Sequence, residues 1–219
     1  MPRFLLTFLI AAIAFGVPAA GQQKVTCATC PPSVLSAADE KKTEPLGPVQ
    51  AGVKHCKAQM KGGFPVPDPK CTPGAINPAL TLEVLRNPDF HTGCVRDCTT
   101  NTKQKNTIYG KYGITHPTNN VNANQTCELD HLVSLELGGA DSLDNIWPQC
   151  GPAGVMLGGR FFKIKDMVEN YLAAEVKAGD IPLDTAQTGI ASDWTQFVPA
   201  AKTFCAVTPA NHEICFPTF

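Results

Sequence analysis

The cysteines of this chain restrict its fold more than any other sequence feature. The chain has 219 residues, ten of which are cysteines. An even number of cysteines behind a secretory signal is typical of a disulfide framework, whereas a cytosolic chain more often uses cysteines for metal binding or redox chemistry. Cys27 and Cys30 have the spacing of a zinc knuckle, but no second CxxC pair follows them. We therefore expect up to five disulfide bonds and no zinc at Cys27 and Cys30.

The N-terminus has the parts of a signal peptide. Arg3 is followed by an almost wholly apolar run over residues 4–17 and then by the small-residue segment PAAG. A membrane-spanning helix needs roughly twenty apolar residues, and no other segment approaches that length. We expect a signal peptide over 1–21 and a secreted, extracellular protein that begins near Gln22 and has no membrane partner.

Proline and cysteine indicate where the hydrophobic core lies. Residues 22–77 contain EPLGPVQAG and GGFPVPDPKCTPG and show little apolar periodicity, as is typical of loops. We expect an N-terminal extension over 22–77 that is held by Cys27, Cys30, Cys56 and Cys71. The core domain is expected over 78–219, a length that is sufficient for one sizeable core.

Two helices are predicted in the second half of the chain. The first covers about 160–177, where apolar residues form one stripe at helical spacing: Phe161, Ile164, Val168, Leu172 and Val176. The second begins at LDTAQ, because Asp184 and Gln187 have the spacing of a capping box. Apolar residues then continue at helical intervals to Phe197. We expect both helices to pack on the core.

A hairpin is predicted over residues 127–149, CELDHLVSLELGGADSLDNIWPQ. Gly138 and Gly139 permit the unusual backbone angles of a turn, and Asn145–Gln149 would return antiparallel to the first strand. The first strand is expected to contain Leu129, Leu132, Val133 and Leu135. Since a helix follows the hairpin after a short insertion, the sequence predicts an α+β fold.

The register of this hairpin would bring two cysteines together. If His131 lies near Ile146, the same register places Cys127 opposite Cys150. A disulfide bond there would fix the two strands and add about 3 kcal/mol of stability in the chain-entropy model. Cys205 and Cys215 are expected to close a second loop near the C-terminus.

The hairpin segment resembles the HNH endonucleases, also called His-Me finger or ββα-metal nucleases. The resemblance is carried by the Asp-His pair, by LELGG, by an Asn fourteen residues after the His, and by the helix that follows. A group of secreted bacterial and fungal proteins is similar over a longer range, about 71–200, with ELDHLVSLELGG, DNIWPQ, KDMVENYL and GIASDWTQ in this order. The resemblance implies a disulfide-rich ββα finger with additional helices.

The resemblance also implies roles for individual residues. His131 would be the general base, Asp130 a metal ligand, and Asn145 the residue that positions the finger or the His. The helix would supply a further ligand. The inserted CGPAGVMLGG departs from the family pattern, so the third metal ligand stays open.

The chemistry of phosphodiester hydrolysis favours the same residue types. His supplies a base with a pKa near neutrality, and a divalent cation held by oxygen ligands neutralises charge on the phosphoryl group. Asp166, Glu169 or Glu128 could join Asp130 around Mg²⁺, with Mn²⁺ or Zn²⁺ as alternatives. Two basic side chains could contact phosphate, Arg96 and Lys165.

Each of these assignments has a structural alternative. His131 could be a half-buried histidine bonded to Asp130 or to a carbonyl. Asn145 could cap a turn. Asp166 and Glu169 have the spacing of helical salt bridges with Lys163 or Lys165. Asn124, in NQT, is a glycosylation sequon that matters only in a secreted eukaryotic protein.

The sequence therefore leaves two functions open. The first is a secreted, metal-dependent nuclease, a hydrolase that cleaves DNA or RNA with His131 as general base. The second is a catalytically inactive, cysteine-rich interaction protein or effector that keeps the finger as a scaffold, because a fold does not imply a function.

Overall fold

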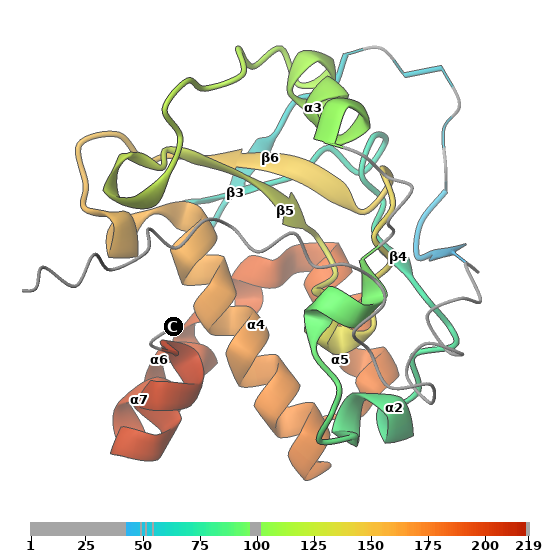
Figure 1. Ribbon diagram of the computed structural model, residues 1–219, viewed down its shortest axis with the longest axis vertical. Helices are drawn as coiled ribbons and strands as arrows, with labels where there is room; N and C mark the ends of the chain where they lie inside the picture. Colours follow the sequence, from blue (N-terminus) through green and yellow to red (C-terminus); the bar gives the residue numbers. More distant parts are fainter. Residues whose placement is uncertain (1–42, 49, 51, 54, 97–101, 218–219) are drawn as a thin grey trace, which may run out of the picture.

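The computed structural model describes residues 43–48, 50, 52–53, 55–96 and 102–217. The expected signal peptide 1–21, together with Cys27 and Cys30, lies outside the described residues. The fold is mixed α+β, with small two-stranded sheets and several helices (Figure 1). Within the described residues, no helix has the length and apolar character needed to cross a membrane.

The central hairpin pairs β5, Cys127–His131, with β6, Ile146–Cys150, in antiparallel orientation. Its register places His131 opposite Ile146 and Cys127 opposite Cys150, as the sequence predicted. The first strand is shorter than expected, because it ends at His131. Leu132, Val133 and Leu135 were expected in the strand but lie beyond it and are all buried. The chain therefore continues from the end of β5 into the hydrophobic core.

The connection between the two strands folds back on the end of β5. It contains a 3₁₀ turn at Leu135–Leu137, followed by Gly138 at φ 75°. At Gly139, a Cβ atom would lie 1.9 Å from the carbonyl oxygen of Val133, which is far inside van der Waals contact. The hairpin therefore closes through a packed loop rather than through the tight turn that the two glycines suggested.

Helix α4, Phe161–Ala178, packs against both strands of this hairpin. Figure 1 shows α4 on one side of the hairpin and α3, Thr102–Lys111, on the other. The predicted stripe is correct at Val168, Leu172 and Val176, which are buried, but Phe162 rather than Phe161 fills the core. The helix ends at Gly179, whose φ of 95° suits glycine.

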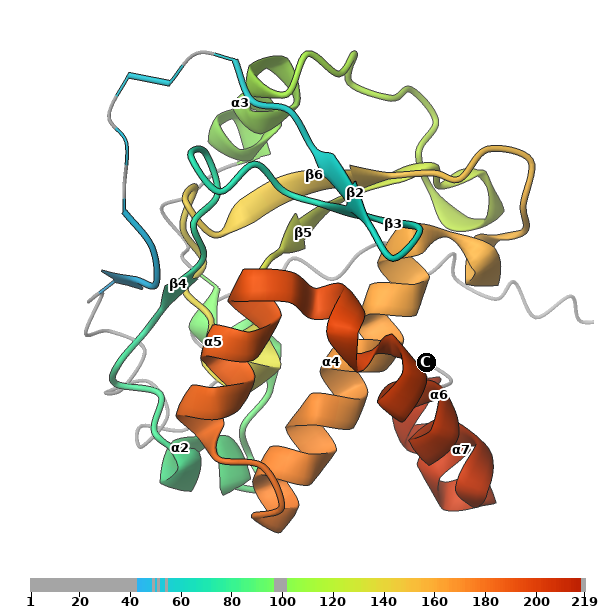
Figure 2. The same ribbon diagram turned by 180° about the vertical axis from the view of Figure 1, so that it is seen from behind.

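The C-terminal helices pack against α4 (Figure 2). They are α5, Leu183–Asp193, a 3₁₀ turn at Trp194–Phe197, α6, Val198–Val207, and α7, Pro209–Cys215. The predicted capping box is wrong. The helix starts at Leu183 with Pro182 as its N-cap, and the buried Gln187 side chain donates to the Leu137 carbonyl at 2.7 Å. Gln187 thus joins α5 to the loop after β5.

Residues before 78 also contribute to the hydrophobic core. Cys56 and Val66 belong to the main hydrophobic cluster, and Trp194 Nε1 donates to the Pro65 carbonyl at 2.9 Å. The strands of this region are β1, Glu44–Pro45, β2, Gln59–Lys61, β3, Phe64–Val66, and β4, Ala75–Ile76. Helix α2, Leu82–Arg86, follows them. Strands of two or three residues are too short to produce a periodic pattern, so the sequence resembled a loop.

Three disulfide bonds join described residues: Cys56–Cys71, Cys127–Cys150 and Cys205–Cys215. The last two are the expected pairs. Cys94 is disulfide-bonded as well. Disulfides persist in oxidising compartments, so these bonds fit the expectation of a secreted protein.

Replacing Cys127 and Cys150 by alanine should lower the free energy of unfolding by about 3 kcal/mol, because a closed loop is removed from the unfolded chain. The bond spans 23 residues. The Cys205–Cys215 bond, which spans 10 residues, is a matched control. Because its loop is shorter, removing it should lower the free energy of unfolding slightly less than removing Cys127–Cys150, with a difference of under about 1 kcal/mol. Urea unfolding of the three proteins measures both values. An unchanged stability without Cys127–Cys150 would contradict the assigned role of this bond.

Candidate functional site

The side chain of Asn145 holds together the loop that connects β5 and β6. Its Oδ1 accepts hydrogen bonds from the backbone N–H groups of Val133 at 2.9 Å and Ala75 at 3.3 Å. Its Nδ2 donates to the carbonyls of Val133 at 2.9 Å and Ala140 at 2.8 Å. The residue is fully buried. Asn145 therefore fixes the backbone directly after His131, which is a positioning role.

His131 is paired with an acid that the sequence analysis did not select. Its Nε2 lies 2.8 Å from Oδ1 of Asp141, and the two side chains are 11% and 1% exposed. Asp141 belongs to the same loop, four residues before Asn145. A buried carboxylate at this distance fixes the orientation and tautomer of an imidazole. The pair thus leaves His131 partly accessible and held in one orientation.

Lys165 of α4 lies at the centre of the expected metal ligands. Its side chain is 0% exposed. The ammonium donates to the His131 carbonyl at 2.7 Å and lies 3.0 Å from Oδ2 and 3.3 Å from Oδ1 of Asp130. It also forms an ion pair with Glu169. The ammonium of Lys165, expected to contact phosphate, is thus buried among the oxygen atoms of the protein in this arrangement.

The two remaining acids, Glu128 and Asp166, lie at the outer edge of this group. Asp166 forms an ion pair with Lys163 at 2.7 Å, between side chains that are 30% and 37% exposed. Glu128 accepts a hydrogen bond from Gln125 at 3.2 Å. The helical salt bridges of the structural alternative are thus present, at Lys163–Asp166 and Lys165–Glu169.

The electrostatics of the group favour a charged Lys165. Burial lowers the pKa of Lys165, but the carboxylates of Asp130 and Glu169 outweigh this effect and the net shift is upward. Burial raises the pKa of Asp130 to about 6 and that of Glu128 to about 7. It also raises the pKa of Glu169 well above its usual range. Burial thus raises the pKa of the carboxyls that surround the Lys165 ammonium, while the ammonium itself counteracts part of this shift.

These residues do not fit a divalent cation as they are arranged. A cation bound by Asp130 and Glu169 would occupy the position that the Lys165 ammonium already fills. Among the residues that the structure describes, no three or more His, Cys, Asp or Glu side chains are grouped so that they could hold a metal ion. The structure thus brings Asp130 and Glu169 together, but around an internal ammonium.

The expected substrate residue Arg96 lies next to the site loop. It is exposed and follows the 3₁₀ turn Thr92–Val95, which contacts the turn Leu135–Leu137. The sequon residue Asn124 is exposed in a 3₁₀ turn directly before β5. Arg96 is therefore placed at the surface that leads to the loop after His131, and Asn124 at the far end of the same strand.

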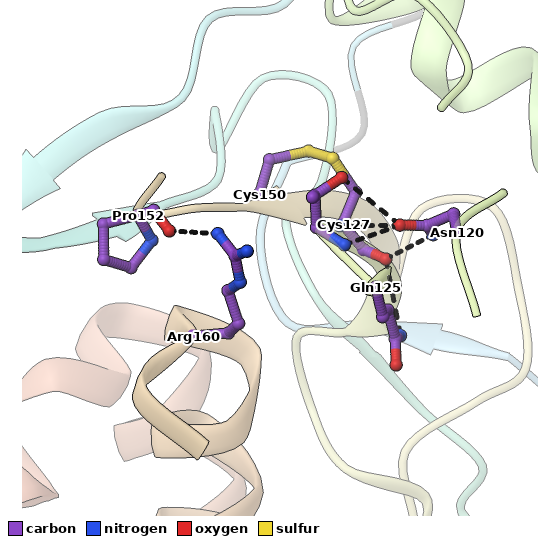
Figure 3. Close-up of a disulfide and its surroundings, with 7 residues drawn as sticks. Asn120, Gln125, Cys127, Cys150, Pro152 and Arg160 are labelled. Atoms are coloured by element: carbon purple, nitrogen blue, oxygen red, sulfur yellow. Dashed lines mark hydrogen bonds between the residues drawn. A yellow bond between two sulfur atoms is a disulfide. The ribbon is translucent and has the colours of Figure 1, made fainter. Parts of the chain in front are cut away.

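Asn120 is a further anchor that the sequence analysis missed. Its side chain donates to the Cys127 carbonyl at 2.7 Å and accepts from the N–H groups of Thr126 at 2.7 Å and Cys127 at 3.1 Å. Figure 3 shows these bonds beside the Cys127–Cys150 disulfide, with Arg160 directed at the Pro152 carbonyl across the inserted loop. Asn120, Cys127 and Arg160 thus fix the end of the hairpin that is remote from His131.

Comparisons with protein-family models, with curated proteins and with solved structures find nothing that matches this chain.

Replacing Asn145 by alanine should lower the free energy of unfolding by about 3 kcal/mol or more, because it leaves several buried backbone groups unpaired at roughly 1–3 kcal/mol each. Asn170 is a matched control, since its amide makes one hydrogen bond, to the Cys215 carbonyl at 3.1 Å. Asn170→Ala should cost about 1 kcal/mol. Urea unfolding measures both. Equal losses would show that Asn145 does not organise the loop.

Proposed function

We propose that this chain is a secreted nuclease that hydrolyses phosphodiester bonds with His131 as its general base. The observation that carries the proposal is the His131–Asp141 pair, with 2.8 Å between Nε2 and Oδ1. This pair lies at the end of a strand, in a loop held by Asn145. A partly exposed imidazole that a buried carboxylate orients is an arrangement suited to proton transfer.

The order of elements supports the nuclease class. Two antiparallel strands, β5 and β6, are followed by helix α4, which packs on both. In the ββα finger that the sequence resembles, the His of the Asp-His pair is the general base and an Asn positions the finger or the His. His131 ends β5 and Asn145 directly precedes β6, which supports these two roles.

The proposed reaction begins with proton removal from water. With Nε2–H donated to Asp141, Nδ1 is the basic nitrogen of His131, and it takes one proton from a water molecule. The hydroxide oxygen forms a bond to phosphorus, and the bond from phosphorus to the leaving oxygen breaks. That oxygen then takes up a proton from solvent. Arg96, exposed beside the site loop, is the proposed contact for the negatively charged phosphate.

The divalent cation that the resemblance implies has no step in this scheme, because Lys165 occupies its place. The same observation favours the second candidate function. A finger whose acids are neutralised internally suits a scaffold that binds a partner without catalysis. The catalytic assay below separates the two functions.

Replacing His131 by alanine should reduce cleavage of plasmid DNA or structured RNA by about 10²–10⁴-fold, the usual contribution of a general base. Asp141→Asn should reduce cleavage as well, because the imidazole loses the carboxylate that fixes its tautomer. The assay uses the secreted, disulfide-bonded protein in parallel with Mg²⁺, with Mn²⁺ and with EDTA.

His55→Ala is the matched control, because His55 is exposed and lies outside the site. It should leave cleavage unchanged. Circular dichroism and thermal unfolding verify that each variant is folded. If the folded wild type cleaves neither DNA nor RNA under any of the three conditions, the nuclease proposal fails and the scaffold function takes its place.

A further inference from the structure

The Lys165 ammonium is surrounded by the ligands that a divalent cation would take. It lies 3.0 Å from Oδ2 of Asp130, 2.7 Å from the His131 carbonyl, and in an ion pair with Glu169. Two carboxylates and a backbone carbonyl are the oxygen ligands that hard cations such as Mg²⁺ and Mn²⁺ prefer. The oxygen atoms around the Lys165 ammonium therefore favour a positive charge at this position.

Lys165 reaches this position from a helix that is fixed by its own packing. Its neighbours on α4, Phe162 and Val168, are 0% exposed, and the Lys165 side chain is also 0% exposed. Moving the ammonium away would leave Asp130 and Glu169 buried without a positive partner, at a high energetic cost. The Lys165 ammonium therefore stays between Asp130 and Glu169 in the folded protein.

A divalent cation would have to share this space with the ammonium. At a separation of about 4 Å, like charges repel strongly in a partly buried site, and a double charge doubles the effect. The carbonyl of His131 and both carboxylates already have a positive partner in Lys165. The ion pair therefore competes directly with metal binding.

We propose that Lys165 is a built-in cation that replaces a divalent metal ion between Asp130 and Glu169. It connects the end of β5, at the carbonyl of His131, to helix α4. The wild-type chain consequently binds no divalent ion at this position. This proposal concerns cation binding alone, so it stands or falls independently of nuclease activity.

Lys163 provides a matched comparison on the same helix. It pairs with Asp166 at the surface, where its side chain is 37% exposed. Removing this ammonium leaves the Asp130–Lys165–Glu169 group intact. Lys163→Met thus changes the net charge of the protein as much as Lys165→Met does, without opening the proposed position.

The test measures Mn²⁺ binding by calorimetry and by the metal-induced rise in melting temperature. Wild type and Lys163→Met should show neither. Lys165→Met should bind Mn²⁺ at least about a hundredfold more tightly than wild type, because the ammonium repulsion is removed. Adding Asp130→Asn to Lys165→Met should abolish the gain. Each readout is independent of catalysis.

Lys165→Met leaves two buried carboxyls and could fail to fold without metal. The double variant Lys165→Met with Glu169→Gln leaves one buried carboxyl, and it should also gain Mn²⁺ binding. The wild-type measurement needs no variant to fold. Saturable Mn²⁺ binding by wild type that Asp130→Asn removes would overturn the proposal, as would folded Lys165 variants that gain no affinity.

Discussion

The hydrogen bonds of the buried Asn145 amide are the constraint on which the site depends. They close a loop that begins directly after His131 and that contains Asp141. Without this closure, Asp141 would lie on a fourteen-residue connection that these bonds no longer hold beside His131 at the end of β5. The bond to Ala75 also ties the loop to β4, so a segment that precedes the hairpin by about fifty residues helps to hold the loop beside His131.

A second constraint acts from the other face of the hairpin. Asp130 faces helix α4, while His131 faces the loop, since neighbouring residues of a strand point to opposite faces. Lys165 bridges this division, because its ammonium contacts the Asp130 side chain and the His131 carbonyl together. One peptide unit of β5 thus carries both the acid that pairs with α4 and the imidazole that pairs with Asp141.

The sequence predicted those parts of the structure that depend on local periodicity and on covalent pairing. The hairpin register that pairs His131 with Ile146 and Cys127 with Cys150 was predicted, and so was helix α4 from its apolar stripe. The pairing of Asp141 with His131 was missed, because it depends on how a loop folds back. The position of Lys165 could not be predicted, since the spacing of a helix does not distinguish a lysine directed at solvent from one directed at buried carboxyls. The strands between residues 59 and 76 were missed because they are too short to show a period.

Gly139 sits where the backbone of the loop after His131 leaves no room for a side chain. A methyl group there would collide with the Val133 carbonyl, which is the same oxygen that receives the Asn145 amide. A single added methyl group would have to displace the Val133 carbonyl, and with it the hydrogen bond from Asn145 that closes the loop carrying Asp141. One hydrogen atom in place of a side chain thus decides whether the loop after His131 can fold back on itself.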